Sequence, residues 1–350
     1  MSGNWLDKNI RNLHPVYFAL VMATGIVSIA AKLKGFDLFS QLLLWLNVGF
    51  YLCLWLFYSI RLFRYFDEFK ADCFCFNRSV GFFTVIAATC VLGSQFNIVA
   101  SNAELATYLW CFALALFPVI FYGVFTCLTI ATNKPGLEEG INGGWLVAVV
   151  ACQGLSLLGS QVANQFTHPD IVIFIATTSW MAGGILYVSL ISLIFYRSIF
   201  LPMTPQEYTS PYWINMGAVA ISTLAGTQLI LHGLDIGFVV EMMPFIKGLT
   251  LLFWATAFSW IPQLVILGCW RYLYKKIPFQ YSPMDWGMVF PLGMFTVSTY
   301  MLARVMHLDW LSIIPEYFVY IAVFAWTFTI FNFARTALQS RHTNTLSNVR

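Results

Sequence analysis

Ten stretches of the chain, each roughly 20 residues or longer, contain no Asp, Glu, Lys or Arg. A stretch of this length can cross the hydrocarbon core of a bilayer as one helix, because a helix satisfies its backbone hydrogen bonds internally. The sequence therefore predicts an all-α integral membrane protein. The ten predicted spans are Asn12–Ala31, Leu38–Ile60, Ser79–Ala103, Leu105–Asn133, Ile141–Pro169, Ile171–Tyr196, Tyr208–Leu234, Gly248–Trp270, Trp286–Ala303 and Tyr317–Ala334.

The composition excludes several other classes of protein. Hydrophobic residues make up 59% of the chain and charged residues only 9%, whereas a soluble domain usually carries about a quarter charged residues. The net charge is +3 and no basic tract is longer than Lys275-Lys276, which argues against nucleic acid as a partner. The eight cysteines lack the spacing of metal or redox sites, so we expect no metal and no cofactor.

The distribution of Lys and Arg predicts the orientation of the spans. If the N-terminus lies in the cytoplasm, 14 of the 18 Lys and Arg fall in cytoplasmic segments, and the exceptions are Lys32, Lys34, Lys247 and Arg304. The positive-inside rule therefore predicts a multi-pass protein of the plasma or inner membrane with both termini in the cytoplasm. We expect one ten-helix transmembrane domain at residues 1–338 and a disordered cytoplasmic tail at residues 339–350.

A short motif repeats along the odd-numbered spans. The sequence Leu-Gly-Ser-Gln at residues 92–95 recurs at residues 158–161 and, more loosely, as Ala-Gly-Thr-Gln at residues 225–228. The glycines at 93, 159 and 226 are therefore 66 and 67 residues apart, about the length of two spans with their loops. The repeat predicts five helical hairpins, although small polar motifs also recur by chance in helical membrane proteins.

Odd and even spans also differ in side-chain size. Spans three, five and seven are rich in Ala, Gly, Ser, Thr, Cys and Gln, whereas spans two, four and eight carry bulky Leu, Phe, Trp and Tyr. Small residues permit close helix packing or line a passage, and bulky aromatics suit contact with lipid. We therefore predict a pseudo-five-fold arrangement, in which an inner ring of five odd helices surrounds a central pore and the even helices lie outside.

Two segments carry a resemblance to a known family. Span one holds Pro15, Tyr17, Phe18, Met22, Thr24 and Gly25, and span nine holds Trp286, Phe290, Pro291 and Gly293. In these residues the chain resembles the tellurite-resistance/dicarboxylate-transporter family, which includes slow anion channels and malate and sulfite transporters. The resemblance implies a pore of kinked inner helices that is narrowed by a phenylalanine on the ninth helix, and assembly as a homotrimer.

The resemblance carries the gating phenylalanine onto Phe290. A bulky ring on a wall of small residues can close a narrow pore by excluding water. Span nine can be aligned with span seven by the Ser-Pro pair that each contains, and span seven with spans five and three by their repeated glycines. This alignment predicts four further pore-lining residues at the level of Phe290. These are Met22, Val85, Ala151 and Ala218. Aligning Gly293 with Gly226 instead gives Cys90, Ser156 and Thr223, and both alignments stay open.

Other candidates shape the path or carry charge. The predicted polar pore-lining residues are Thr24, Ser222 and Thr296. Helix kinks are predicted at Gly25, Gly93, Gly159, Gly226, Pro291 and Gly293. Helix packing is an equally good interpretation of these positions. Lys32 and Arg304 are candidates for attracting anions. Glu241, His232 and Glu316 are the candidates for coupling transport to protons.

These features predict small-anion transport across the plasma membrane through a pore occluded by Phe290, as in a channel. The partners are the lipid bilayer and a small inorganic anion or dicarboxylate. The alternative is a proton-coupled C4-dicarboxylate carrier or a sulfite exporter, which needs a titrating group in its cycle. No catalytic motif is present, so we do not expect an enzyme, and a membrane-embedded redox enzyme is a remote alternative.

Overall fold

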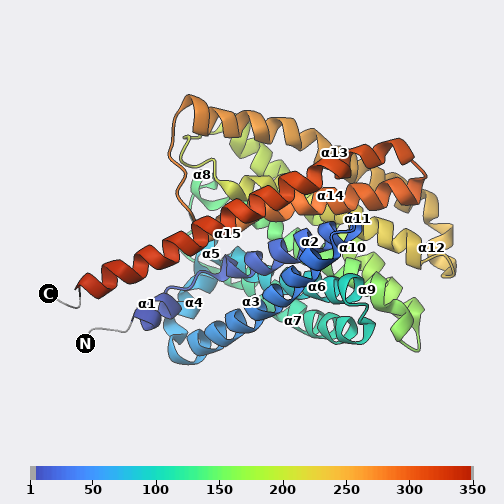
Figure 1. Cartoon of the computed structure of the whole chain (residues 1–350), viewed down its shortest axis with the longest axis horizontal. Coiled ribbons are helices and arrows are strands. Elements are labelled where there is room, and N and C mark those ends of the chain that lie inside the picture. Colours follow the sequence, from blue (N-terminus) through green and yellow to red (C-terminus); the bar gives the residue numbers. More distant parts are fainter. Residues whose placement is uncertain (1–4, 348–350) are drawn as a thin grey trace.

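The computed structural model describes residues 5–347, and the side chains of residues 7–339. All regular elements in this range are helical, and ten helical segments within it are long and apolar enough to cross a membrane (Figure 1). The odd spans are Pro15–Leu33, Phe76–Val99, Gly143–Gln165, Ser210–His232 and Pro283–Met306. The even spans are Asp37–Arg64, Ala103–Ile130, Pro169–Phe200, Met243–Tyr274 and Asp309–Gln339. The prediction of an all-α protein with ten spans is confirmed.

The odd spans form the inside of the molecule and the even spans the outside. Between 78 and 94% of the residues in the most apolar part of each odd span are buried, against 17 to 44% for the even spans. The main helices of the odd spans are α2 (Ala19–Leu33), α6 (Phe83–Val99), α9 (Val147–Val162), α11 (Ile214–His232) and α14 (Trp286–Met306). Each packs on the next, and α14 returns to α2, so the ring is closed.

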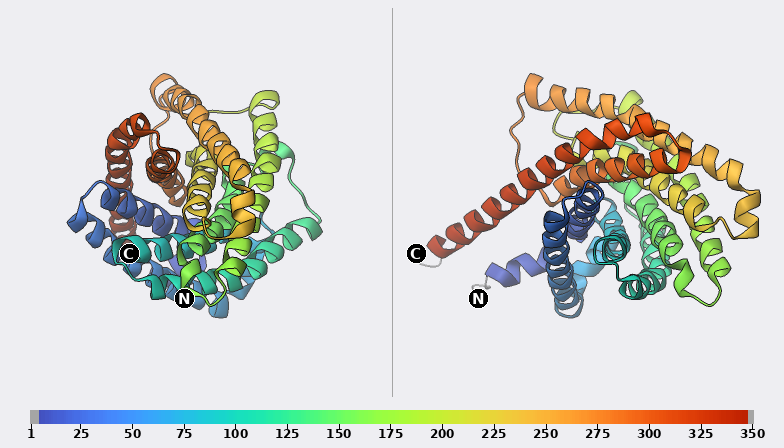
Figure 2. Two further views of the ribbon diagram at one scale, coloured as in Figure 1. Left: turned by 90° about the vertical axis from the view of Figure 1, so that its right-hand side faces the viewer. Right: turned by 45° about the vertical axis from the view of Figure 1, so that its right-hand side comes forward.

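Each even span covers the odd span that precedes it and also reaches the next one. The even helices are α3 (Asp37–Arg64), α7 (Ala103–Ile130), α10 (Pro169–Phe200), α13 (Met243–Cys269) and α15 (Ile313–Ser347). Each donates a side-chain hydrogen bond to the following hairpin. The pairs are Asn47 with Gln95, Trp110 with the Leu155 carbonyl, Trp180 with the Ser222 carbonyl, Trp254 with Thr299, and Trp326 with Thr24. Viewed along the long axis, the hairpins follow one another around the centre from blue to red (Figure 2, left).

A 3₁₀ turn lies near the start of every odd span and leads into its main helix. The five turns are Pro15–Phe18, Val80–Phe82, Gly143–Leu146, Ser210–Trp213 and Pro283–Asp285. Proline at the first or second position of three of them fixes the backbone without losing a needed hydrogen bond. The turns also contact one another in a closed ring, hereafter the ring of turns. A Cβ atom on Gly143 would lie 2.2 Å from the Pro211 carbonyl oxygen, so this contact joins two backbones and leaves no room for a side chain.

The glycines of the repeat serve close helix packing. A Cβ atom on Gly25, Gly93 or Gly293 would lie 2.7, 2.4 or 2.8 Å from a side-chain atom of the neighbouring odd span. The same atom on Gly159 or Gly226 would meet Trp110 or Thr250 of an even span at 2.8 or 2.1 Å. All five glycines, and Pro291, lie inside uninterrupted α-helices. Packing is therefore the observed role of these glycines, and kinks at the six positions stay a prediction.

The remaining α-helices are short. They are α1 (Trp5–Arg11), α4 (Phe66–Phe74), α5 (Phe76–Ser79), α8 (Leu137–Gly140) and α12 (Gly237–Glu241). One of them, α5, forms the start of the third span. The N- and C-terminal ends of the chain lie at the same end of the bundle (Figure 1). Helix α15 is drawn to Ser347, and the disorder of the tail at residues 339–350 stays a prediction. Residues 348–350 of the predicted tail lie outside the described part of the chain.

Candidate functional site

Two cavities lie inside the ring of odd spans, and each is lined by all five of them. The first is formed by the N-terminal halves of these spans and is called the N-side cavity; its volume is about 40 Å³. Its opening is lined by the ring of turns through Val16, Val80, Gly144, Pro211 and Met284. Beyond the turns, every odd helix contributes at least one lining residue. Among these are Met22, Thr84, Val150, Ile214 and Phe290.

The second cavity lies between the C-terminal halves of the odd spans and is called the C-side cavity. Its volume is about 290 Å³, and its apolar floor again takes one residue from each helix: Ile26, Val91, Leu157, Leu224 and Met294. Closer to its opening the lining becomes polar, with Ser94, Asn97, Gln161, Gln228, His232 and Arg304. The C-side cavity is therefore larger and more polar toward the solvent than the N-side cavity.

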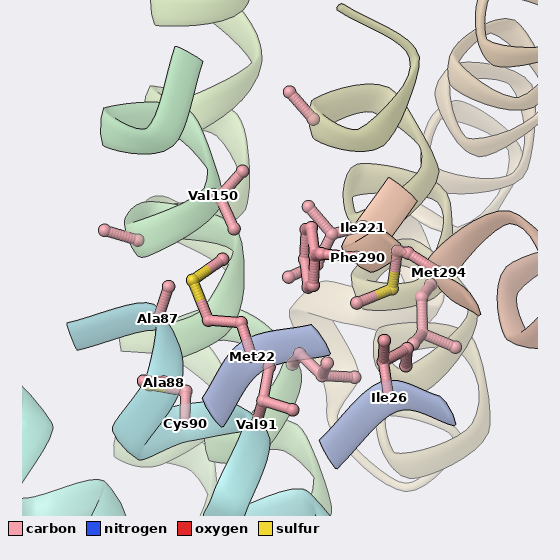
Figure 3. Close-up of a cluster of buried hydrophobic side chains, with 14 of the residues drawn as sticks. Met22, Ile26, Ala87, Ala88, Cys90, Val91, Val150, Ile221, Phe290 and Met294 are labelled. Atoms are coloured by element: carbon pink, nitrogen blue, oxygen red, sulfur yellow. The ribbon is translucent and has the colours of Figure 1, made fainter. Parts of the chain in front are cut away.

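An apolar layer separates the two cavities. Phe290 and Met294 on α14 are four residues apart, as are Met22 and Ile26 on α2, which corresponds to a rise of about 6 Å. Phe290 is 2% exposed, and its ring lies in a cluster with Met22, Val150, Ile221 and Met294 (Figure 3). Side chains of the other odd helices, including Ala87 and Cys90, fill the rest of this cluster. Phe290 is the largest side chain labelled in this layer.

Met22 and Phe290 both line the N-side cavity, whereas the residues predicted on the other three odd helices line neither cavity. Their roles in a pore stay predictions. Thr84 and Val150 line the N-side cavity, where Val85 and Ala151 were predicted. Ala218 is fully buried between helices and lines neither cavity, and the same holds for the alternative candidates Cys90, Ser156 and Thr223. A shift of one residue turns a helix by about 100°, which moves a side chain from the path into the helix interface.

The three predicted polar pore residues face neighbouring helices. Thr24 accepts a hydrogen bond from Trp326 Nε1 at 3.0 Å. Ser222 donates to the Ala218 carbonyl oxygen at 2.7 Å. Thr296 donates to the Leu292 carbonyl oxygen and lines a lateral cavity between α2, α14 and α15. These hydroxyl groups are satisfied within or between helices, so they contribute to packing and do not line either axial cavity.

The predicted charged candidates separate into paired and cavity-lining groups. Lys32 is paired with Asp37, and its Nζ lies 2.6 Å from the carboxylate oxygen. Glu316 pairs with Lys34 at 3.6 Å, and Glu241 is exposed at the end of α12. Arg304 and His232, in contrast, line the C-side cavity. Of the five charged or titratable candidates, only these two reach the central path.

The backbone gives the two cavities opposite electrostatic character. All five odd helices run in the same direction around the ring, so their N-terminal ends surround the N-side cavity and their C-terminal ends the C-side cavity. A helix N-terminus carries about half a positive elementary charge, and the C-terminus about half a negative one. Neutral backbone groups therefore favour an anion at the N-side cavity, whose lining includes no Asp, Glu, Lys or Arg.

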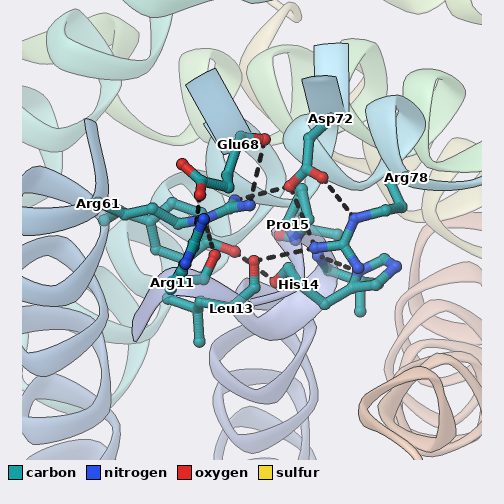
Figure 4. A network of polar contacts seen from close by, with 11 residues as sticks. Arg11, Leu13, His14, Pro15, Arg61, Glu68, Asp72 and Arg78 are labelled. Atoms are coloured by element: carbon teal, nitrogen blue, oxygen red, sulfur yellow. Dashed lines mark hydrogen bonds and ion pairs between the residues drawn. The ribbon is translucent and has the colours of Figure 1, made fainter. Parts of the chain in front are cut away.

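A buried polar network anchors the ring of turns to the surface helix α4 (Figure 4). Asp72 accepts charge-assisted contacts from two arginines: Arg61 Nη1 lies 2.6 Å from Asp72 Oδ2, and Arg78 Nε lies 2.6 Å from Asp72 Oδ1. Arg78 also donates to the Leu13 carbonyl oxygen at 3.2 Å. This network was not predicted from the sequence, where the charged segment between spans two and three gave no sign of burial.

His14 connects this network to the N-side cavity. It directly precedes the first span, it lines the cavity, and its Nδ1 accepts a hydrogen bond from the Val16 amide at 3.1 Å. Burial, with a further contribution from the Arg78 charge, lowers the pKa of His14 from 6.5 to about 4. His14 is therefore neutral at physiological pH.

The lowered pKa of His14 makes stability depend on pH. The unfolded chain binds a proton near pH 6.5 and the folded chain only near pH 4, so stability is lost as the pH falls through this window. The loss is at most about 1.4 kcal/mol per pH unit. We expect the melting temperature of the wild type to fall more between pH 7.5 and 5 than that of His14→Asn, which keeps the acceptor for Val16. Equal falls would contradict the assignment.

Ten spans around two coaxial cavities are typical of a membrane channel or transporter. The chain belongs to the voltage-dependent anion channel family, whose sequence pattern matches residues 12–334. The match covers all five hairpins, so the resemblance predicted from spans one and nine is confirmed.

Several curated proteins are similar to the chain. An uncharacterized membrane protein of Mycobacterium tuberculosis is 35% identical over 144 residues, which is 41% of this chain and 73% of the relative. An uncharacterized transporter of Methanocaldococcus jannaschii is 23% identical over 333 residues and matches 93% of this chain and 95% of the relative. A sulfite efflux pump of Arthroderma benhamiae is 23% identical over 359 residues, which covers 95% and 92% of the two chains.

Proposed function

We propose that the protein lets small anions cross the plasma membrane along the axis of the odd spans, and that Phe290 occludes this path. The observation that carries the proposal is the pair of coaxial cavities, each lined by all five odd spans, with an apolar layer around Phe290 between them. Such a layer blocks ions because water is excluded from a narrow apolar constriction.

The charge distribution supports an anion as the transported species. Five helix N-termini surround the N-side cavity, and Arg304 lines the C-side cavity. The labelled side chains around Phe290 include no Asp, Glu, Lys, Arg or His (Figure 3). Without a fixed charge at this depth an anion binds weakly, which favours passage over tight capture.

A channel is the favoured mode. A proton-coupled carrier needs a titrating group that reaches the path, and of the three candidates Glu241, Glu316 and His232 only His232 lines a cavity. We also propose that both termini lie in the cytoplasm and that three copies assemble, in line with the Lys and Arg distribution and with the resemblance stated above.

Flux measurements in proteoliposomes test the proposed function. With a chloride or nitrate gradient, we expect anion flux that follows the electrochemical gradient and is not accompanied by proton movement. The comparison is made with and without a pH gradient, and with malate and sulfite as additional anions. Malate or sulfite transport that requires a proton gradient would instead identify the protein as a coupled carrier. Liposomes with Phe290→Ala that show no flux of any of these anions would contradict the proposed function.

A further inference from the structure

We propose that the C-side cavity contains an anion-binding site centred on Arg304, with Ser94, Gln161 and Gln228 as further hydrogen-bonding partners. The site takes a small monovalent anion and binds it on the C-terminal side of the Phe290 layer. The inference deepens the proposed function and rests on it for a role in transport, but binding itself can be measured without any transport.

The first argument is that Arg304, unlike the nearby lysines, forms no ion pair with a carboxylate in the part of the chain that the structure describes. Lys32 and Lys34 are each paired with a carboxylate, Asp37 and Glu316. Among the residues whose side chains are described, no carboxylate lies within ion-pair distance of Arg304. Its guanidinium carbon lies 6.0 Å from the centre of the Tyr300 ring, a contact that leaves the N–H groups free. Arg304 is thus an unpaired cation on the wall of a cavity.

The second argument is an unsatisfied polar group in the same cavity, on α6. Ser94 is 1% exposed and lines the cavity, and its Oγ has no hydrogen-bond partner. A buried polar group without a partner costs free energy, typically about 1–3 kcal/mol, so the Ser94 hydroxyl, which can donate, calls for an acceptor in the cavity. The Oε1 atom of Gln161, which also lines the cavity and lacks a partner, only accepts, so it calls for water and not for the anion.

The third argument is the electrostatics of the backbone. The C-terminal ends of the five odd helices surround this cavity and carry partial negative charge, which disfavours an anion. A fixed cation is therefore needed here, whereas the N-side cavity attracts anions without one. The last turn of α14, where Arg304 lies, is a position where a cation is also stabilised by the helix dipole.

The chemistry of the lining indicates the ligand class. One guanidinium supplies one positive charge and a planar pair of N–H donors, which matches two oxygens of a planar oxyanion. The amides of Gln161 and Gln228 and the Ser94 hydroxyl add neutral donors. A dicarboxylate requires a second cation, and Arg304 is the only Lys or Arg among the lining residues of this cavity. The site therefore favours a monovalent anion such as nitrate.

Nitrate binding to the purified full chain in detergent tests the proposal. We expect nitrate to raise the melting temperature of the wild type in a saturable way, and Arg304→Gln to weaken the apparent affinity by roughly tenfold or more, since a hydrogen bond to a charged group is lost. Arg304→Lys keeps the charge without the planar fork and should fall between the two. Ser94→Ala should weaken binding by a smaller factor, about two- to fivefold.

The matched control is Lys247→Gln, which removes a cation near the same end of the molecule but outside the cavity. It should leave nitrate affinity unchanged. The proposal is overturned if Arg304→Gln and Lys247→Gln have equal effects, or if Arg304→Gln binds nitrate like the wild type. Because the readout is binding, a failure of Phe290→Ala to change flux would contradict the proposed function while leaving this site intact.

Discussion

Replacing Phe290 by alanine is expected to raise anion current by roughly tenfold or more, because the substitution removes the largest side chain from the layer between the two cavities. A tenfold change corresponds to a barrier lower by about 1.4 kcal/mol. The alanine leaves space next to Met22 and Val150, so the N-side and C-side cavities approach each other along α14. Electrophysiology of the variant with chloride, nitrate and malate measures the increase and its selectivity.

Phe295→Ala is the matched control for this experiment. Phe295 lies on the same helix and is 0% exposed, but its ring packs against Trp254 at 6.3 Å and Phe318 at 5.1 Å, between centroids, on the even helices α13 and α15. It therefore has the same burial and the same substitution without lying on the path. A large loss of stability with little change in current is expected. Equal currents in the two variants and the wild type would show that Phe290 does not occlude the path.

Replacing Asp72 by asparagine is expected to lower the free energy of unfolding by about 3–5 kcal/mol, the usual cost of removing one partner from a buried ion pair. Asp72 is 6% exposed and Arg61 is 1% exposed. Without the carboxylate, the two guanidinium groups of Arg61 and Arg78 face each other with no counter-charge. The connection between α4 and the ring of turns would weaken as a result.

Thermal unfolding in detergent measures this effect, with Asp67→Asn as the control. Asp67 lies on the same helix α4 and is exposed, so its substitution should change stability by less than about 0.5 kcal/mol. If the melting temperatures of the two variants fall by the same amount, the buried network contributes no more to stability than a single surface charge. That result would contradict its role in anchoring the ring of turns.

The arrangement of the helices could be predicted from the sequence because it depends on coarse properties. Charge-free stretches long enough to cross a bilayer have few alternatives in a chain with this composition. The contrast between small and bulky residues distinguished the inner spans from the outer spans. Only small residues allow neighbouring helices to approach as closely as they do at Gly93 and Gly226. The boundaries of several spans, such as Met243–Tyr274, moved by a few residues because the helices extend beyond the apolar core.

The register of the pore lining could not be predicted in the same way. The odd spans are buried on almost every side and carry small polar residues among apolar ones all around the helix, so no periodic pattern distinguishes the side that faces a cavity. Positions are carried from span seven to spans five and three by the glycine steps alone, which fix the spacing between spans but not the side of the helix that faces a cavity. Thr84 and Val150, which line the N-side cavity, lie one position before the predicted Val85 and Ala151.

The ring of turns was missed, although part of its signal was present. A proline follows His14, Ser210 and Ser282, and a proline at such a position is typical of the beginning of a helix. These pairs occur in three of the five odd spans. The remaining two turns contain Gly81 and Gly143, whose need for close backbone contact is a property of the folded neighbours. Sequence spacing alone carries no information on such contacts.

The backbone contacts within the ring of turns restrict how a conducting state can arise. Gly143 lies directly against the Pro211 carbonyl group of the adjacent turn. No side chain lies between these two backbones, so the ring of turns cannot widen there without separating them. Rotation of a single benzyl group, by contrast, disturbs only its immediate neighbours. The ring of turns thus forms a rigid frame. Under the proposed function, we therefore expect permeation to depend on a change in the rotamer of Phe290 or on a small tilt of α14.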